Sequence, residues 1–322
     1  QNADLVVSIG SRLSKCATGY NDELFAREAK VVVVDVDEHE HKKNTIHIDK
    51  FIHGDAKDFL SRLSIEKKKE YVNWANIVKH WKEKYPVCLQ EFYDDTNGIS
   101  MYAFTNELNK CMKDDDVVIT DAGSTFYVVP QTLKFTSLKQ RYVMSSAQAE
   151  MGFTVPGSIG VCFAKGKTNT IGIVGDGSLQ MNIQELQTIK YNKLPIKLFV
   201  WNNGGYLSIR GAQKNRFNGR YLGSSEESGT SLPNLKKISD AYGIKYANIS
   251  HIADAEEIII EVSGVDEPVI CEVMCKYEEW ILCTWSKQTL SDGHIILMPI
   301  EDMVPLLPRD EFYNEMIVKP VS

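Results

Sequence analysis

Short apolar runs rich in β-branched residues alternate with longer amphipathic segments along most of this chain. The runs include VVVVDVD at 31–37, TIGIVG at 170–175 and IKLFVWN at 196–202. They are shorter than an ordinary helix, and Val and Ile favour strands. Strands that are apolar on both faces and separated by helices form parallel sheets covered on both sides. The sequence therefore predicts an α/β protein with two doubly wound, Rossmann-like parallel-sheet units.

Composition and motif spacing suggest four segments in the 322 residues. Residues 1–65 are typical of part of a Rossmann-like domain, with a helix expected over 23–30. Residues 66–100 are rich in Lys, Glu, Trp and Tyr, which indicates a helical linker. The second α/β unit is expected over 101–285, and the Pro-rich tail 286–322 is expected to wrap a surface or a partner. Because Gln1 leads directly into a strand, we expect the chain to be a piece of something longer.

Charge and hydropathy argue against two kinds of partner. The formal net charge is -7, so the basic excess that attracts nucleic acid is missing. No apolar run approaches the ~18–20 residues of a membrane span, so no membrane partner is expected. The seven cysteines are odd in number and scattered, which favours free thiols and a cytoplasmic location. Cys271 and Cys275 share one face of a predicted strand, and we expect them to pack in the core.

Two polar loops follow neighbouring predicted strands and suit a phosphate and a cation. The first, GDGS at 175–178, precedes a predicted helix, where backbone amides can face a phosphate. The second, NNGGY at 202–206, is separated from GDG by twenty-four residues. Mg²⁺ binds oxygen ligands from the protein, phosphate and water, so Asp176, Asn203 and the Gly205 carbonyl are the expected metal ligands. Either loop alone is also typical of a plain turn, but the pair at this spacing favours a site.

This spaced pattern resembles the cofactor signature of thiamine diphosphate (ThDP, also called thiamine pyrophosphate or TPP) enzymes. GDGSLQMNIQEL together with NNGGY is similar to the form in acetolactate synthases and pyruvate decarboxylases. The resemblance implies ThDP and Mg²⁺ as cofactors, with Met151 propping the bent cofactor and Ala149 beside its pyrimidine edge. The cofactor-binding residues that the resemblance implies are Ala122, Gly123, Ser124, Thr125, Ala149, Met151, Gly175, Gly177, Ser178, Asn203, Gly205 and Tyr206.

The resemblance also implies that the working enzyme is larger than this chain. Residues 1–65 are similar to the latter half of the family's central domain, which binds FAD in acetolactate synthases and nothing in many relatives, so FAD stays open. The glutamate that activates the cofactor belongs to a pyrimidine-binding domain without a counterpart here, so no catalytic residue is expected in this chain. The complete enzyme is expected to be a homodimer or homotetramer. We expect this chain alone to bind Mg²⁺ and ThDP without turnover.

The implied activity is that of an acetolactate synthase-like transferase, a carboligase that decarboxylates pyruvate or another 2-oxo acid and joins the acyl unit to a carbonyl acceptor. Ile209 holds the place of a decarboxylase glutamate, which favours carboligation. Ser124-Thr125 replaces the usual Gln-His, and Ala212 replaces a Trp that shapes the acceptor pocket, which leaves room for a bulkier acceptor such as an activated sugar ketone. Another ThDP decarboxylase or lyase, a sugar-modifying acyl transferase and a non-catalytic subunit remain alternatives.

Near the expected pocket mouth, three basic residues follow the NNGGY loop. They are Arg210, Lys214 and Arg216. They could contact an anionic acceptor or be solvated surface charges, and the sequence favours the solvated surface.

Overall fold

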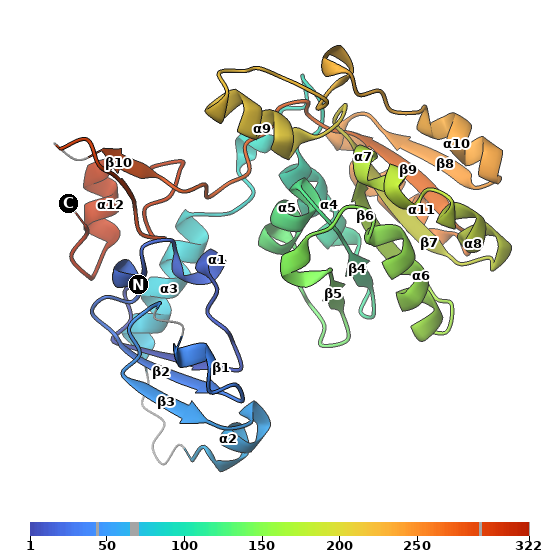
Figure 1. Cartoon of the computed structure of the whole chain (residues 1–322). Helices are drawn as coiled ribbons and strands as arrows, with labels where there is room; N and C mark the ends of the chain where they lie inside the picture. Colours follow the sequence, from blue (N-terminus) through green and yellow to red (C-terminus); the bar gives the residue numbers. More distant parts are fainter. Residues whose placement is uncertain (43–44, 65–70, 290–291, 322) are drawn as a thin grey trace. The chain divides into compact units, whose positions relative to one another are not determined.

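The computed structural model describes residues 1–42, 45–64, 71–289 and 292–321 (Figure 1). They form two compact units, one made of residues 1–78 and 282–322 and the other of residues 79–281. The expected boundary between residues 65 and 66 and the Lys67-Lys68-Lys69 triplet lie outside the described residues. Residues 282–322 belong to the same compact unit as the N-terminal segment, so the fold groups together segments that the sequence analysis kept apart.

The first unit is built on a parallel sheet with strand order β1-β2-β3. The strands are β1 (Leu5–Ile9), β2 (Lys30–Asp35) and β3 (Lys50–His53). Buried Ala26, Val31, Val33 and Ile46 form its core. α2 (Ala56–Arg62) begins after Asp55, whose side chain accepts the Lys57 and Asp58 backbone N–H groups as an N-cap. The short helices in this segment are α1 (Lys15–Thr18), η1 (Asp22–Leu24) and η2 (Glu40–Lys42).

The helix expected over 23–30 is wrong. Only the single turn η1 forms, and the backbone then enters the left-handed region at Ala26, with φ of 48°. A non-glycine residue in that region ends a right-handed helix. Ala26 is buried in the core and donates its N–H to Gln1 Oε1 at 2.6 Å, so tertiary contacts hold this conformation.

The tail packs with the N-terminal segment through specific polar contacts. Arg27 and Glu301 form an ion pair of 2.6 Å in which both side chains are largely buried. The Asn2 side chain accepts the backbone N–H groups of Ile317 and Val318. The tail contains the antiparallel pair β10 (Lys287–Thr289) and β11 (Ile295–Leu297), followed by α12 (Arg309–Glu315).

The second unit is built on a six-stranded, fully parallel sheet of order β5-β4-β6-β7-β9-β8 (Figure 1). Its strands are β4 (Val117–Ile119), β5 (Arg141–Val143), β6 (Thr170–Gly175), β7 (Ile196–Asn202), β8 (Lys245–Ile249) and β9 (Val269–Met274). Two lie at the sheet edges, β5 and β8, and the sequence analysis did not identify either. Both Cys271 and Cys275 are buried, which confirms the expected core packing.

Helices cover both faces of this sheet, so the expected doubly wound α/β fold is confirmed. Leu198 and Val200 of β7 pack into a core with residues of α6, α8 and α10. The alternate residues Phe199 and Trp201 contact Phe104 of α4, with ring centroids 5.4 and 6.0 Å apart. The main helices are α4 (Met101–Cys111), α5 (Ser124–Thr132), α6 (Thr154–Ala164), α7 (Asp176–Leu179), α8 (Glu185–Tyr191), α9 (Leu207–Arg216), α10 (Leu235–Tyr242) and α11 (Ala255–Gly264).

The remaining helical elements lie before or between these. They are α3 (Val72–Lys84), which has no buried residue, and the 3₁₀ turns η3 (Gln90–Tyr93), η4 (Ser146–Gln148), η5 (Gln180–Asn182), η6 (Glu226–Ser228) and η7 (Ile252–Asp254).

The strand order creates a crevice beyond the carboxyl ends of β4 and β6. From β4 the chain passes to β5 on one side and then returns to β6 on the other side. At such a switch point the loops beyond the carboxyl ends of the strands diverge, and open α/β sheets bind ligands there. The loops at 120–124 and 175–178 flank this crevice, and the loop after β7 adjoins it.

Candidate functional site

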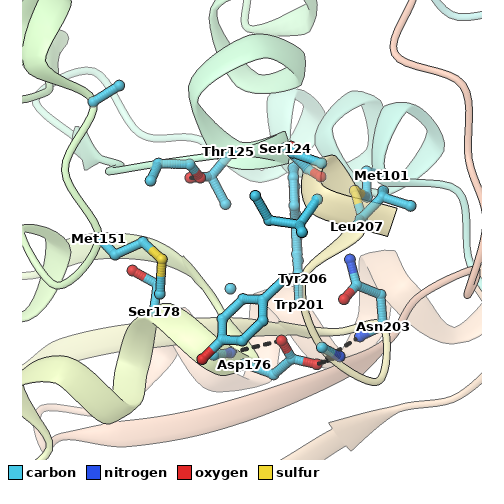
Figure 2. A pocket seen from close by; sticks show the side chains of 18 residues that line it. Met101, Ser124, Thr125, Met151, Asp176, Ser178, Trp201, Asn203, Tyr206 and Leu207 are labelled. Carbon is cyan, nitrogen blue, oxygen red and sulfur yellow. Dashed lines mark hydrogen bonds between the residues drawn. The ribbon is translucent and has the colours of Figure 1, made fainter. Parts of the chain in front are cut away.

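A pocket of about 270 Å³ lies beyond the carboxyl ends of β4, β6 and β7 (Figure 2). Asp176 lines it, and so do all the residues that the sequence analysis named as cofactor contacts. These are Ala122, Gly123, Ser124, Thr125, Ala149, Met151, Gly175, Gly177, Ser178, Asn203, Gly205 and Tyr206. The structure therefore brings four separate segments together at one place.

Asp176 is the first residue of α7, directly after β6, and its carboxylate joins the two polar loops. Oδ1 accepts the N–H of Gly177 at 2.6 Å, while Oδ2 accepts those of Asn203 and Gly205 at 3.1 and 3.0 Å. Burial raises the pKa of Asp176, and these backbone hydrogen bonds oppose the rise. Burying a negative charge is unfavourable, so a cation bound next to this carboxylate would stabilise it.

Asn203 presents a buried oxygen that nothing in the described part of the chain satisfies. The residue is 8% exposed, and its Oδ1 has no hydrogen-bond partner. Buried polar atoms normally have a partner, so an orphan beside Asp176 indicates a ligand or a cation. Figure 2 shows the Asn203 side chain next to the hydrogen-bonded Asp176 carboxylate.

Two glycines allow the loops to approach closely. A Cβ on Gly205 would lie 2.6 Å from the Ser224 carbonyl oxygen, and the Gly205 φ of +124° is strained for other residues. A Cβ on Gly177 would overlap the Tyr206 ring, with two ring carbons at 3.0 Å and a third closer. Glycine at 177 therefore lets the loop after β7 pack against the start of α7, and glycine at 205 lets that loop pack against Ser224.

Asp121 and Ser178 link three of the loops around the pocket through hydrogen bonds. Ser178 Oγ donates to Asp121 Oδ2 at 2.6 Å and accepts the Gly152 N–H at 2.8 Å. Asp121 also accepts the N–H groups of Ala122 and Thr154. Burial raises the pKa of Asp121, and its hydrogen bond from Ser178 opposes this rise. The Ser178 hydroxyl therefore holds loops in place, and only its backbone N–H is left for a diphosphate.

The loop after β4 leads into the N-terminus of α5. Gly123 precedes this helix with φ of +65°, and Ser124 and Thr125 form its first turn. The first N–H groups of a helix have no partner within it, so this turn offers donors to an anion. Thr125 Oγ1 donates to the Ala122 carbonyl at 3.0 Å, so its hydroxyl is engaged within the loop.

Two domain models of one enzyme family match the chain. The central domain of thiamine pyrophosphate enzymes matches residues 1–63. Their C-terminal TPP binding domain matches residues 121–273, which contain every pocket residue except Met101. The chain belongs to the thiamine pyrophosphate enzyme family. The expectation of a ThDP-enzyme fold is thereby confirmed.

The relatives of this ThDP-family chain include acetolactate synthases. The large subunit from Porphyra purpurea is 30% identical over 279 residues, which are 84% of this chain and 46% of the relative. Acetolactate synthase 3, chloroplastic, from Brassica napus is 28% identical over 295 residues, with 88% and 44% covered. The chloroplastic acetolactate synthase from Arabidopsis thaliana is 28% identical, with 88% and 43% covered. The chain thus spans less than half the length of these relatives.

Some lining residues of the ThDP-family pocket were missed in the sequence analysis. Leu207 and Ser208 directly follow the NNGGY loop, and Trp201 directly precedes it, so their position next to the motif was a usable signal. Met101 comes from the N-terminus of α4, and no local pattern connects it with the other residues. Ile209, whose place was predicted beside the reacting groups, lines the pocket and is half exposed.

Of the three basic residues after the loop, Lys214 and Arg216 lie at the surface, as the sequence favoured, whereas Arg210 does not. None of the three lines the pocket. Arg210 is only 3% exposed, so both the acceptor contact and the solvated surface charge are wrong for it. Lys214 forms an exposed ion pair of 2.7 Å with Glu278, and Arg216 is exposed. Ala212 does not line the pocket either, so a wider acceptor space at that residue has no support in this geometry.

Two other features are absent from the part of the chain that the structure describes. No helix there is long and apolar enough to cross a membrane. No cluster of three or more His, Cys, Asp or Glu side chains there could hold a metal. A metal at the pocket would therefore need amide and carbonyl oxygens besides the single carboxylate.

Proposed function

We propose that this pocket binds Mg²⁺ and the diphosphate of ThDP, and that the chain is part of an acetolactate synthase-like transferase. The observation that carries the proposal is the buried, unpartnered Asn203 Oδ1 beside Asp176 in a pocket lined by the expected cofactor residues. Membership of the ThDP family supports the choice of cofactor. The acetolactate synthases among the relatives support the reaction type.

In the proposed metal site, three oxygens come from the chain. They are an Asp176 carboxylate oxygen, Asn203 Oδ1 and the Gly205 carbonyl oxygen. One carboxylate with neutral oxygens suits Mg²⁺, which keeps phosphate and water ligands as well. The Asn203 amide would then gain the partner that it otherwise lacks.

The diphosphate would be held by backbone N–H groups at two helix starts. The loop at 122–125 leads into α5, and residues 177–178 form the start of α7. Helix N-termini carry partial positive charge and N–H groups without a partner inside the helix. At α7 the Ser178 N–H is the remaining donor, because the Gly177 N–H already bonds to Asp176 Oδ1. Ala149, with a left-handed φ of 46°, and Met151 line the pocket as the proposed contacts of the pyrimidine ring.

When bound, ThDP supplies a nucleophilic thiazolium carbon and an electron sink for the decarboxylation of a 2-oxo acid. The chain's own residues orient the cofactor and exclude water from it. The apolar Ile209 at the pocket favours transfer of the acyl unit to a carbonyl acceptor, because it offers no proton to end the reaction early. We assign no catalytic residue in this chain, because the resemblance assigns the activating glutamate to the pyrimidine-binding domain.

Several features of the complete enzyme belong to the same proposal. We propose a homodimer or homotetramer that acts on pyruvate or a similar 2-oxo acid. A cytoplasmic location stays a prediction, and two of the relatives are named chloroplastic. Residues 1–63 match the central domain.

The test is a titration of the chain with ThDP, with and without Mg²⁺, by calorimetry and by tryptophan fluorescence, since Trp201 lines the pocket. Asp176→Asn and Asn203→Leu should lose the Mg²⁺-dependent binding. Asp240→Asn, an exposed carboxylate on α10, is the matched control and should bind like the wild type.

Each outcome bears on a separate part of the proposal. Binding that is independent of Mg²⁺ would contradict the metal ligands, and no binding by the wild type would contradict the cofactor site. Product analysis with pyruvate tests the reaction, because acetolactate marks a carboligase and acetaldehyde a decarboxylase. We expect binding without turnover from this chain alone.

A further inference from the structure

The Arg210 guanidinium is held in a cage of carbonyl oxygens behind the NNGGY loop. Nη2 donates to the Asn203 and Tyr277 carbonyls at 3.0 and 2.6 Å. Nη1 donates to the Gly204 and Ser224 carbonyls at 3.3 and 3.1 Å. The guanidinium carbon also lies 4.0 Å from the centroid of the Tyr277 ring. Within the described residues, all four hydrogen-bond acceptors of this charge are thus backbone carbonyls.

Three features make the position of the Arg210 charge energetically unfavourable. Arg210 is 3% exposed, and burying a charge without a charged partner is unfavourable. Among the described residues no carboxylate lies within salt-bridge distance of it. It is also the fourth residue of α9 (Leu207–Arg216), near the helix N-terminus, where the helix dipole disfavours positive charge. A costly charge that stabilises one loop conformation is the arrangement expected of a positioning residue.

Two side chains of opposite charge, Asp176 and Arg210, form hydrogen bonds with the backbone of the loop at 203–205. Asp176 accepts the N–H groups of Asn203 and Gly205, whereas Arg210 donates to the carbonyls of Asn203 and Gly204. The peptide units on both sides of residue 204 therefore have fixed orientations. Those orientations restrain the backbone that carries the Asn203 side chain. The next peptide unit, which contains the Gly205 carbonyl, is held by the Tyr206 N–H, and this N–H donates to the same Ser224 carbonyl that Arg210 binds.

We infer that Arg210 is a positioning residue that holds the 203–205 loop in its metal-binding conformation. The inference rests on the proposed Mg²⁺ site, and it gives the buried guanidinium a role that neither a substrate contact nor a surface charge explains. Residues that orient metal ligands typically change metal affinity about 10–100-fold when they are lost.

The test compares Arg210→Met, which keeps an apolar stem, with Arg210→Lys and with Lys214→Met as the control. Lys214 lies one turn further along α9 and is exposed. We expect Arg210→Met to weaken the Mg²⁺ affinity at fixed ThDP by about tenfold or more. Arg210→Lys should lie between it and the wild type, because an ammonium lacks the planar fork. Lys214→Met should stay within about twofold of the wild type, inside the usual range for surface changes.

Two further measurements separate this role from general stability. Hydrogen exchange of a peptide covering 203–206, without any ligand, should be faster in Arg210→Met, while exchange in β7 stays unchanged. Added guanidinium ion should restore Mg²⁺-dependent binding in Arg210→Ala. Wild-type affinity and wild-type loop exchange in folded Arg210→Met would overturn the inference. A wild type that binds no ThDP would instead overturn the proposed function, and the loop exchange would still decide whether Arg210 positions the loop.

Discussion

Ser178 Oγ donates a 2.6 Å hydrogen bond to Asp121 Oδ2, and this contact joins loops that are 57 positions apart in the sequence. The same hydroxyl accepts the Gly152 N–H at 2.8 Å, so one side chain satisfies two buried groups. Ser178 stays predicted as a cofactor-binding residue through its backbone, while its side chain acts within the protein. The geometry of the pocket therefore depends on this hydroxyl even before a ligand binds.

Ser178→Ala should lower the free energy of unfolding by about 1–3 kcal/mol, because Asp121 Oδ2 loses its short hydrogen bond and the buried Gly152 N–H keeps only the longer contact of 3.3 Å to Asp121 Oδ2. Urea unfolding measures the change. Ser239→Ala is the matched control, since Ser239 is fully buried and its Oγ has no partner among the described residues. That control should be neutral or stabilising. Equal losses in the two variants would contradict the role of the Ser178 hydroxyl.

Gly177→Ala should abolish ThDP binding, because the added methyl group would overlap the Tyr206 ring and displace the loop after β7. Calorimetric titration with ThDP and Mg²⁺ measures this loss. Gly160→Ala is the control, because Gly160 is an exposed glycine in α6 with nothing within 4 Å of an added Cβ. That change should raise stability by about 0.5–1 kcal/mol. Wild-type affinity in Gly177→Ala would show that the close approach is unimportant.

Lys197 makes stability depend on pH in the alkaline range. This residue of β7 is fully buried, and its Nζ donates to the carbonyls of Val265 and Glu267. Burial lowers its pKa from 10.5 to about 8, although the nearby Asp266 and Glu267 oppose the shift. The native state therefore loses this proton near pH 8, while the unfolded chain keeps it until about pH 10.5.

Because the unfolded state binds more protons in this window, the free energy of unfolding should rise from pH 8 to 10.5. The expected rise is roughly 1–3 kcal/mol relative to a Lys197→Met variant. The comparison removes the contributions of other groups, such as buried thiols, that titrate in both proteins. Urea unfolding at several pH values measures it. Parallel curves for the two proteins would refute the assignment to Lys197.

Thiol reactivity should separate buried cysteines from exposed ones. Cys271 is fully buried in β9, and burial raises its pKa from 9.0 to about 12, while Cys16 is exposed. That shift alone lowers the thiolate fraction about a thousandfold relative to a thiol of ordinary pKa. Alkylation at pH 8, followed by peptide mass spectrometry, should label Cys16 long before Cys271. Rapid labelling of Cys271 in the folded chain would contradict the observed core.

Much of the fold was predictable where burial was complete. The runs that became β2, β6 and β7 are apolar on both faces, and this pattern identifies central parallel strands. The edge strands β5 and β8 contain polar residues and are covered less, so periodicity did not reveal them. The expected helix over 23–30 failed because the contacts of Ala26 with the core and with Gln1 outweighed local propensity.

The sequence by itself determined which residues gather beyond the strand ends, since parallel strands place their carboxyl ends at one edge of the sheet. The resemblance to thiamine diphosphate enzymes then identified individual pocket residues from Ala122 to Tyr206. Only the tertiary structure decided what those side chains contact. Arg210 is buried because the carbonyls of Ser224 and Tyr277, from distant segments, converge on it with those of its own loop. A charged side chain can be buried only where the three-dimensional fold supplies such hydrogen-bond partners. The spacing of residues along the sequence does not reveal these partners, because they come from distant segments.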